Sequence, residues 1–194
     1  MTELKDYIVP EKLKRIAEIQ RKLAERIVER PLRLSEIKWV AAVDVSYRGN
    51  FSCSALVVCT FPECEPVETR TVRVEVAFPY VPTYFFLRET RPVIVVTKGA
   101  EFDVLLVEGQ GRAHPRGYGL ASHIGLLLGR PTIGVAKKAL KGVEPELYRR
   151  VGKAYVSVGH LVDLKSAADV VSALGGSYPK PLKLADRLSK GCWI

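Results

Sequence analysis

Two apolar runs each place a single acid where a buried β-strand is expected. KWVAAVDVSY (38–47) contains Asp44, and DVLLVEG (103–109) contains Glu108. Continuous apolar runs rich in β-branched residues predict strands that are covered on both faces. An ionised carboxylate in such surroundings is costly unless it is paired or binds a metal. The fold must therefore bring a partner to each of these acids.

The first half of the chain predicts a helix followed by three strands. Apolar residues recur at helical spacing over 10–30, with Pro10 in the first turn and Pro31 after the end. The runs 38–47, 51–60 and 71–78 favour strands and are joined by short turns. Three strands connected in this way predict an antiparallel meander.

The second half alternates strands with helices. The segment 83–99 is ambiguous, because Pro92 and the Val-Ile run after it favour a strand on propensity alone. Together with the meander, this alternation predicts an α/β fold whose central mixed sheet is flanked by helices, in one domain over 1–194. Beyond 99, we expect strands at 103–109, 131–137 and 153–159, and helices at 118–129, 163–174 and 181–190.

Charge and composition narrow the class of partner. The chain has 30 Lys and Arg against 21 Asp and Glu, a net charge of +9, which favours a polyanion such as nucleic acid. No apolar run approaches the ~18 residues of a membrane span, and the N-terminus lacks an apolar signal core. We expect a monomer in the cytoplasm that does not contact membranes. Without CxxC spacing, a zinc site is disfavoured and reduced core thiols are expected for Cys53, Cys59, Cys64 and Cys192.

Asp44 and Glu108 are candidates for a shared metal site. Neighbouring strands lie ~4.8 Å apart, so acids at matched heights would repel each other. A divalent cation between them would resolve this repulsion, and oxygen-only ligation suits Mg²⁺ or Mn²⁺. Spacing alone leaves an alternative open, in which two unrelated acids at strand ends are each paired with Lys or Arg.

Two loops carry further chemistry. EGQGRAHPRGYGLASHIG (108–125) crowds glycines and cations at the carboxyl end of a strand, where α/β folds bind ligands and bare backbone can approach a base or phosphate. In PYVP (79–82), two prolines stiffen a loop that holds Tyr80. A rigid aromatic side chain can wedge between stacked bases. The alternative is that Tyr80 packs on the protein's own core.

Six motifs together resemble endonuclease V. They occur in the family's order and cover most of residues 38–190: VAAVDVSY, FPYVP followed by LRE, DVLLVEGQGRAHPRGYGLASHIG, PTIGVAKKAL, SVGHLVDL and PKPLKLAD. The resemblance implies a ribonuclease H-like fold and metal-dependent DNA-repair cleavage at a phosphodiester bond 3′ to deoxyinosine (hypoxanthine) or another deaminated base. It also implies that the ambiguous segment after Pro82 is helical.

The resemblance assigns roles to particular residues. It implies a metal site for Mg²⁺, or Mn²⁺, formed by Asp44, Glu108 and Asp186. The wider catalytic set that it implies is Asp44, Glu89, Glu108, Lys137 and Asp186. The nucleic-acid contacts that it implies lie at Pro79, Tyr80, Val81, Pro82, Thr83, Gly109, Gly111 and His114.

Some positions depart from the family or have supporting roles. Glu108 stands where the family usually has Asp, and a carboxylate displaced by about 1 Å can lower the rate about 10²-fold. Thr83 stands where Gly is common. We expect His123 to be a hydrogen-bonded structural residue and His160 to support the active site from behind.

Two other functions remain open from the sequence. One is the same chemistry on RNA that contains inosine, which would need a different fit of the groove. The other is a nucleic-acid binder without catalysis, whose site decayed through Glu108; the presence of Asp44, Glu89, Lys137 and Asp186 argues against it.

Overall fold

The computed structural model describes residues 10–194. The prediction that no secretion signal is present rests partly on residues 1–9, which lie outside this range. The elements in chain order are α1 (Pro10–Ala24), η1 (Leu34–Glu36), β1 (Trp39–Arg48), β2 (Phe51–Thr60), β3 (Pro66–Glu75), α2 (Phe85–Thr97), β4 (Val104–Glu108), α3 (Leu120–Leu128), β5 (Thr132–Ala136), η2 (Pro145–Leu147), β6 (Tyr148–Val151), β7 (Ala154–His160), α4 (Leu164–Ala173) and α5 (Lys180–Gly191).

One mixed sheet organises these elements, as the sequence predicted. Its strand order is β3-β2-β1-β4-β5-β7-β6. The antiparallel meander β1–β2–β3 forms one half, and β4 and β5 run parallel to β1 in the centre. Val43 pairs with Val107, so the next residues, Asp44 and Glu108, lie at the same height on adjacent strands. Because side chains alternate along a strand, both acids belong to the same face of the sheet.

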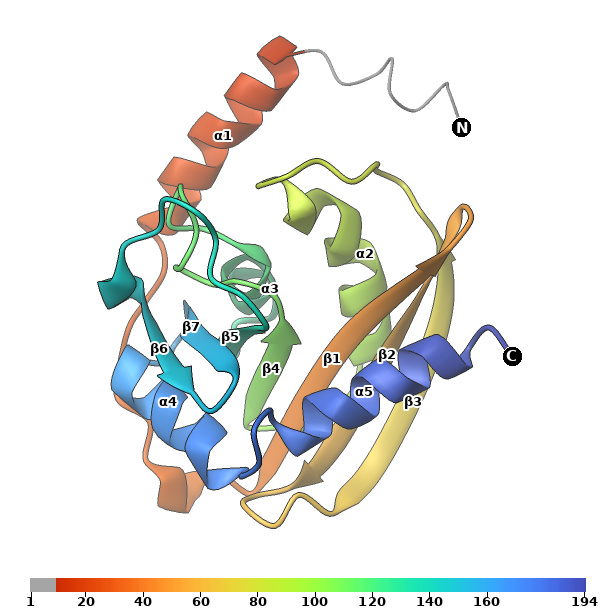
Figure 1. Cartoon of the computed structure of the whole chain (residues 1–194), viewed down its shortest axis with the longest axis vertical. Coiled ribbons are helices and arrows are strands. Elements are labelled where there is room, and N and C mark those ends of the chain that lie inside the picture. The colour runs from red at the N-terminus through yellow and green to blue at the C-terminus, as the bar shows by residue number, and fades with distance from the viewer. Residues whose placement is uncertain (1–9) are drawn as a thin grey trace.

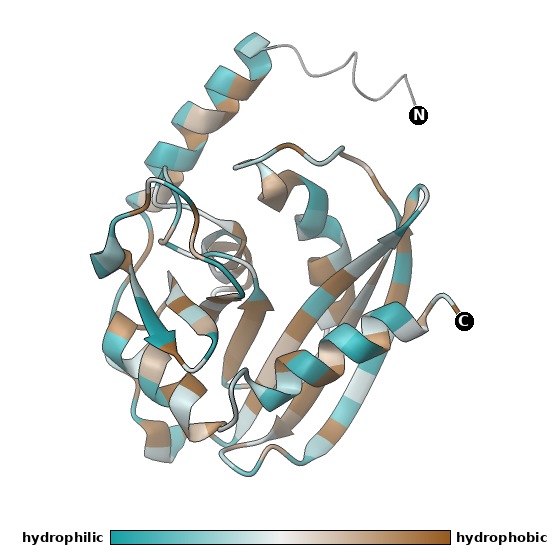
Figure 2. Cartoon of the chain, in the orientation of Figure 1, coloured by the Kyte–Doolittle hydropathy of each residue, from teal (hydrophilic) through white to brown (hydrophobic). Residues whose placement is uncertain are grey.

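Helices cover both faces of this sheet. Ala41, Val43 and Leu105 pack with side chains of α2 and α3 on one face. Val40 and Leu106 pack on the other face with α4 and with Leu182 of α5. In Figure 1, α5 crosses the front of the β1–β2–β3 half, and α2 lies behind it. Figure 2 shows hydrophobic residues along the central strands and mostly hydrophilic residues on α1.

The ambiguous segment after Pro82 is helical, as the family resemblance implied. Its apolar residues Phe86, Val93 and Val96 are buried on one side of α2 and contribute to the core. Pro92 lies inside the helix. Tertiary burial of one helical face therefore outweighs the β-propensity of the Val-Ile run.

Two elements have boundaries that differ from the prediction by several residues, and one strand was not predicted. The helix predicted over 10–30 ends at Ala24, because the chain after it pairs with the segment that follows β7: Leu161 N–H donates to Val28 O at 2.7 Å, and Asp163 N–H donates to Arg30 O at 2.8 Å. The third strand begins at Pro66 and ends at Glu75, instead of covering 71–78. The four-residue strand β6 was not predicted, since so short a run carries little periodicity.

None of the helices within residues 10–194 has the length and hydropathy needed to cross a bilayer.

The prediction of reduced thiols was wrong for two cysteines. Cys53 in β2 and Cys192 at the end of α5 form a disulfide, with their Cα atoms 6.3 Å apart. Cys59 and Cys64 are free, and their sulfur atoms lie 3.4 Å apart. Sequence separation concealed the pairing, because the bonded cysteines are 139 positions apart and only the packing of α5 on the sheet brings them together.

Removing this disulfide should lower thermal stability. A cross-link that closes so long a loop restricts the unfolded chain, and its loss typically costs about 2–4 kcal/mol, or about 5–15 °C in Tm for a chain of this size. We expect this loss in Cys192→Ser, measured by calorimetry without reductant, while Cys64→Ser serves as the control. Alkylation of four thiols in the unfolded, unreduced wild-type protein would contradict the assignment.

Candidate active site

Asp44 and Glu108 form the centre of the site. Asp44 lies in β1 and is only 8% exposed, and Glu108 is the last residue of β4. Ser189 Oγ donates to Asp44 Oδ2 at 2.7 Å, and Tyr178 OH donates to Glu108 Oε2 at 2.6 Å. Burial raises the pKa of Asp44 and raises that of Glu108 to about 7, with the charge of neighbouring carboxylates adding to both shifts. The two acids therefore stand in a region that disfavours uncompensated negative charge.

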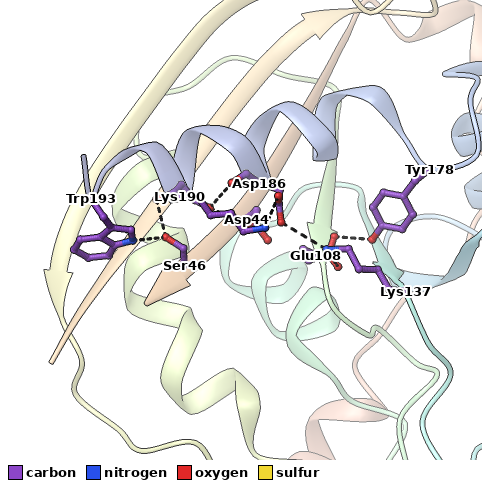
Figure 3. Close-up of polar contacts among 9 residues, drawn as sticks. Asp44, Ser46, Glu108, Lys137, Tyr178, Asp186, Lys190 and Trp193 are labelled. Atoms are coloured by element: carbon purple, nitrogen blue, oxygen red, sulfur yellow. Dashed lines mark hydrogen bonds and ion pairs between the residues drawn. The ribbon is translucent and has the colours of Figure 1, made fainter. Parts of the chain in front are cut away.

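Helix α5 and the end of β5 bring a third acid and two cations to the same place. Lys137, directly after β5, has its Nζ 3.8 Å from Glu108 Oε1 and 3.6 Å from Asp186 Oδ1. Lys190 Nζ lies 2.7 Å from Asp186 Oδ2, one helical turn away. Burial tends to raise the pKa of Asp186, but the ammonium groups of Lys190 and Lys137 hold it below its ordinary value. Figure 3 shows these side chains facing one another between α5 and the strand ends.

Glu89 approaches from the opposite face of the sheet. It lies in α2, is almost fully buried, and accepts a hydrogen bond from Tyr47 OH at 2.8 Å. Burial raises its pKa well above the ordinary value, and the charges of Asp44 and Glu108 add to this shift. The charge of Glu89 is coupled to those of Asp44 and Glu108, but within residues 10–194 it makes no hydrogen bond to either acid.

A hollow of about 160 Å³ lies beside the Pro79–Pro82 loop. Tyr80 borders it and is 63% exposed, with its ring centroid 6.0 Å from that of Phe85 in an edge-on contact. The structure therefore argues against the alternative in which Tyr80 is a core residue. Other residues around the hollow are Thr83, Phe86, Gly109, Gln110, His114 and Leu120.

Thr83 holds an unusual backbone conformation at the rim of this hollow. Its φ of 66° lies in the left-handed region that glycine adopts readily. Arg116 donates to Thr83 Oγ1 at 2.8 Å and also to its carbonyl oxygen. His114 Nε2 lies 3.0 Å from the same carbonyl, and its Nδ1 accepts from Arg116 N–H at 3.2 Å, so the ring donates through Nε2. Burial lowers the pKa of His114 to about 4, which keeps the ring neutral.

Gly111 lies apart from the hollow. Its N–H donates to Ser157 Oγ at 2.9 Å, and a Cβ at this position would collide with Val158 O of β7. Close packing against β7 thus accounts for the glycine, and the backbone contact to a base that the resemblance implies would need to come from Gly109 instead.

Two histidines outside the hollow have structural contacts. His123 Nδ1 lies 2.8 Å from Tyr118 OH, and its ring packs on Phe86, as expected for a hydrogen-bonded structural residue. The prediction for His160 was wrong. It pairs with Thr132 at the start of β5, whereas Lys137 follows the end of that strand, and its Nδ1 accepts from Val28 N–H at 3.3 Å.

Sequence comparisons identify the family. The family profile described as Endonuclease V matches residues 21–154. Endonuclease V of Pyrococcus abyssi is 62% identical over 180 residues, which is 92% of each chain. Endonuclease V of Thermococcus kodakarensis is 62% identical over 179 residues, covering 92% of this chain and 91% of its own length. The chain belongs to the endonuclease V family.

Solved structures of endonuclease V share the fold. The protein from Ciona intestinalis, solved with a 24mer DNA containing an inosine followed by a ribo-adenosine, matches with a TM-score of 0.85 at 26% identity, over 95% of this chain and 98% of its own. The catalytic domain of human endonuclease V matches with a TM-score of 0.83 at 28% identity, over 94% and 96%. The ribonuclease H-like α/β architecture predicted from the sequence is therefore confirmed.

Sequence reasoning missed three residues that contact the acids: Tyr178, Ser189 and Lys190. Tyr178 lies in the loop between α4 and α5, and Ser189 and Lys190 lie in the last turn of α5. The 186, 189, 190 spacing on one helix was a usable signal, since residues three and four apart share a face. No comparable signal marked Tyr178, whose contact with Glu108 spans 70 positions.

The donor chemistry of the cluster fits a hard divalent cation. Carboxylate oxygens are the ligands that Mg²⁺ and Mn²⁺ prefer, and the burial of Asp44 and Glu108 favours a compensating positive charge. Between residues 10 and 194, however, no three His, Cys, Asp or Glu side chains converge as a ready metal-binding group. Instead, the hydroxyl groups of Ser189 and Tyr178 and the ammonium groups of Lys137 and Lys190 compensate part of the negative charge of these carboxylates.

The raised pKa of Glu108 predicts how stability changes with pH in the absence of metal. Its folded pKa of about 7 exceeds the ordinary 4.5, so the folded state holds the proton more tightly and stability falls as pH rises through about 7. Relative to Glu108→Gln, we expect the wild type in chelator to lose up to about 3 kcal/mol between pH 5 and pH 8. Denaturant titrations of both proteins measure this difference. Parallel curves for the two proteins would show that Glu108 does not titrate in this way.

Proposed function

We propose that this chain is a metal-dependent DNA-repair endonuclease that cleaves the phosphodiester backbone 3′ to deoxyinosine. The observation that carries the proposal is the meeting of Asp44, Glu108, Asp186 and Lys137 beside a hollow bordered by the exposed Tyr80. Family membership and the inosine-containing DNA bound by the Ciona intestinalis relative support it.

In this proposal the carboxylates of Asp44, Glu108 and Asp186 hold Mg²⁺ or Mn²⁺. When bound, such an ion supplies positive charge for the leaving oxygen and acidifies water. Ser189 and Tyr178 orient the first two carboxylates through the hydrogen bonds described above. Each of these carboxylates has a second oxygen that these two hydroxyls do not engage.

Lys137 and Glu89 complete the catalytic set. The Lys137 side chain is 61% exposed and lies between Glu108 and Asp186, so its ammonium group can neutralise charge that develops on a phosphate at the cluster. Glu89, held by Tyr47, is coupled to Asp44, and in its ionised form its charge would strengthen the demand for a cation.

The hollow beside Tyr80 would take the flipped base. Its walls combine Phe86 and Leu120 with backbone at Thr83 and Gly109, which suits a planar base read by stacking and by main-chain groups. Tyr80, on its proline-flanked loop, would fill the gap that the base leaves in the stack, with Pro79, Val81 and Pro82 holding the loop. His114, neutral and hydrogen-bonded to Thr83, would present its ring to the nucleic acid.

The direct test uses labelled DNA and RNA strands that each contain one inosine. Asp44→Asn should abolish cleavage in Mg²⁺ and in Mn²⁺ while binding of the inosine strand persists, because only the metal-holding charge is lost. Gel mobility and cleavage assays measure the two properties separately. Full activity of Asp44→Asn would remove this residue from the site.

The RNA arm of that experiment addresses a second candidate function. The DNA bound to the Ciona intestinalis relative carries a ribo-adenosine after the inosine, so a ribose at that position is compatible with binding in that protein. Faster cleavage of the RNA strand than of the DNA strand would assign this chain to inosine-containing RNA.

Tyr80→Ala tests the wedge. Because the side chain is mostly exposed, its loss should change the Tm by less than about 2 °C. Loss of a stacked aromatic typically costs about 1–3 kcal/mol, so we expect binding to inosine-containing duplex to weaken about tenfold. Single-stranded inosine DNA is the control, since no stack needs to be opened there. A large fall in Tm with unchanged binding would make Tyr80 a structural residue.

Glu108 and Tyr178 should act as a unit. A hydrogen bond to a charged group contributes about 1.5–3 kcal/mol, so Tyr178→Phe should lower cleavage about tenfold or more by freeing the Glu108 carboxylate. Glu108→Asp should also lower it, because the shorter side chain withdraws from Tyr178. In the double variant the second change should add little, since the contact is already lost.

Two measurements make this cycle decisive. Mn²⁺ affinity, measured by calorimetry, should fall in both single variants, and it reports on the site independently of turnover. Additive losses in rate and affinity would show that Tyr178 does not act through Glu108. A rise in rate for Glu108→Asp would instead mark Glu108 as a compromised ligand.

A further inference from the structure

A second and larger cavity opens beside the acid cluster. Its volume is about 680 Å³, within the range of sites that hold small molecules. Glu108, Lys137 and Asp186 form one wall. The proposed base hollow meets the same strand end one residue further on, at Gly109, but it is walled by α2, α3 and the Pro79–Pro82 loop. The end of β4 therefore borders both cavities, which share no lining residue.

Three cations besides Lys137 line the larger cavity. Lys183 and Arg187 are one turn apart on α5, and Lys153 lies in the β6–β7 turn. Within residues 10–194 none of the three forms a salt bridge, unlike Lys137 and Lys190. Unpaired cations from two separate elements thus surround one space, which favours an anionic occupant.

The position of Lys153 depends on a close backbone contact. Lys153 N–H donates to Ser177 O at 2.7 Å, which ties the β6–β7 turn to the loop before α5. Gly152 has φ of 57°, and a Cβ there would lie 2.7 Å from the same Ser177 oxygen. Only glycine allows this approach, so the turn is fixed against the cavity wall and Lys153 is held at its rim.

The apolar part of the lining offers little contact surface. Tyr178 and Leu182 border the cavity, but Tyr178 is only 8% exposed and Leu182 1%, and the Tyr178 hydroxyl is already engaged by Glu108. The cations therefore decide the class of occupant. Positive side chains from α5 and from the β6–β7 turn suit the successive phosphates of a nucleic-acid strand.

We propose that this cavity binds the nucleotide on the 3′ side of the cleaved bond. The inference rests on the proposed function: with the lesion in the smaller hollow and cleavage at the acids, a strand that continues past the cut enters the larger cavity. Lys153, Lys183 and Arg187 contact the phosphates on the 3′ side of this nucleotide.

The test compares inosine strands with different 3′ arms. One strand ends directly after the nucleotide that follows the cut bond and so lacks the phosphates on its 3′ side, and the other continues for about six nucleotides. Lys183→Ala/Arg187→Ala should raise KM for the long-arm strand about tenfold, leave kcat within about twofold, and reduce the salt dependence of log KM by about 1.4, the value for two phosphate contacts on a single strand. The short-arm strand should be affected much less.

Arg33→Ala/Lys165→Ala is the matched control. It removes the same two charges from exposed positions that pair only with Glu36 and Asp169, and it should behave as wild type. Both double variants should melt within about 2 °C of wild type, because exposed positions usually tolerate alanine. Equal KM values for the two double variants on the long-arm strand would overturn the subsite.

Failure of the proposed function gives a different pattern. In that case the wild type cleaves neither strand. Binding of the uncut strands, measured by fluorescence anisotropy in chelator, then tests the subsite independently of cleavage. Tighter binding of the long arm that disappears in Lys183→Ala/Arg187→Ala supports the cavity as a nucleotide site. Binding that is independent of arm length overturns it.

Discussion

Mutual repulsion between two buried carboxylates is the constraint on which the rest of the site depends. Parallel pairing of β1 with β4 sets Asp44 and Glu108 at the same height and on the same face, where burial already disfavours their charged forms. No sheet held only by apolar packing would keep this arrangement without compensation. Hydroxyl donors, two lysines and the proposed divalent cation are the compensation, and each must be delivered by an element outside the two strands.

Helix α5 supplies most of the groups that compensate the charge of Asp44 and Glu108. The helix carries Asp186, Ser189 and Lys190 on the side that meets the acids, while Lys183 and Arg187 line the neighbouring cavity. Its place on the sheet is fixed by burial of Leu182 and Ala185 near its start and by the Cys53–Cys192 disulfide at its end. A displacement of this helix would therefore disturb the acid cluster and the larger cavity together, which links stability of the C-terminal segment to the chemistry.

Local sequence patterns predicted the central features of the fold, whereas contacts between segments distant in sequence could not be predicted from them. The strands bearing Asp44 and Glu108 were evident because apolar runs with one acid are uncommon, and α2 required the family resemblance because Val93 to Val96 favour a strand locally. The disulfide, the early end of α1 at Ala24 and the hydrogen bond from Tyr178 to Glu108 all join residues far apart in sequence. Periodicity carries no information on such pairs.

The hydrogen bond from Tyr178, a residue far from Glu108 in the sequence, explains how Glu can stand in place of the shorter Asp at the end of β4. Lengthening the side chain from Asp to Glu moves the carboxylate outward and adds a rotatable bond, both of which loosen a site that depends on fixed geometry. In this chain the outward carboxylate meets the Tyr178 hydroxyl, which is buried and has no other hydrogen-bond partner among residues 10–194. An Asp at position 108 would leave that hydroxyl unpaired, and another residue at 178 would leave Glu108 free to move. The effect of a Glu at position 108 therefore depends on the residue at position 178 that binds its carboxylate. A change at either position is tolerated best when the other position changes with it.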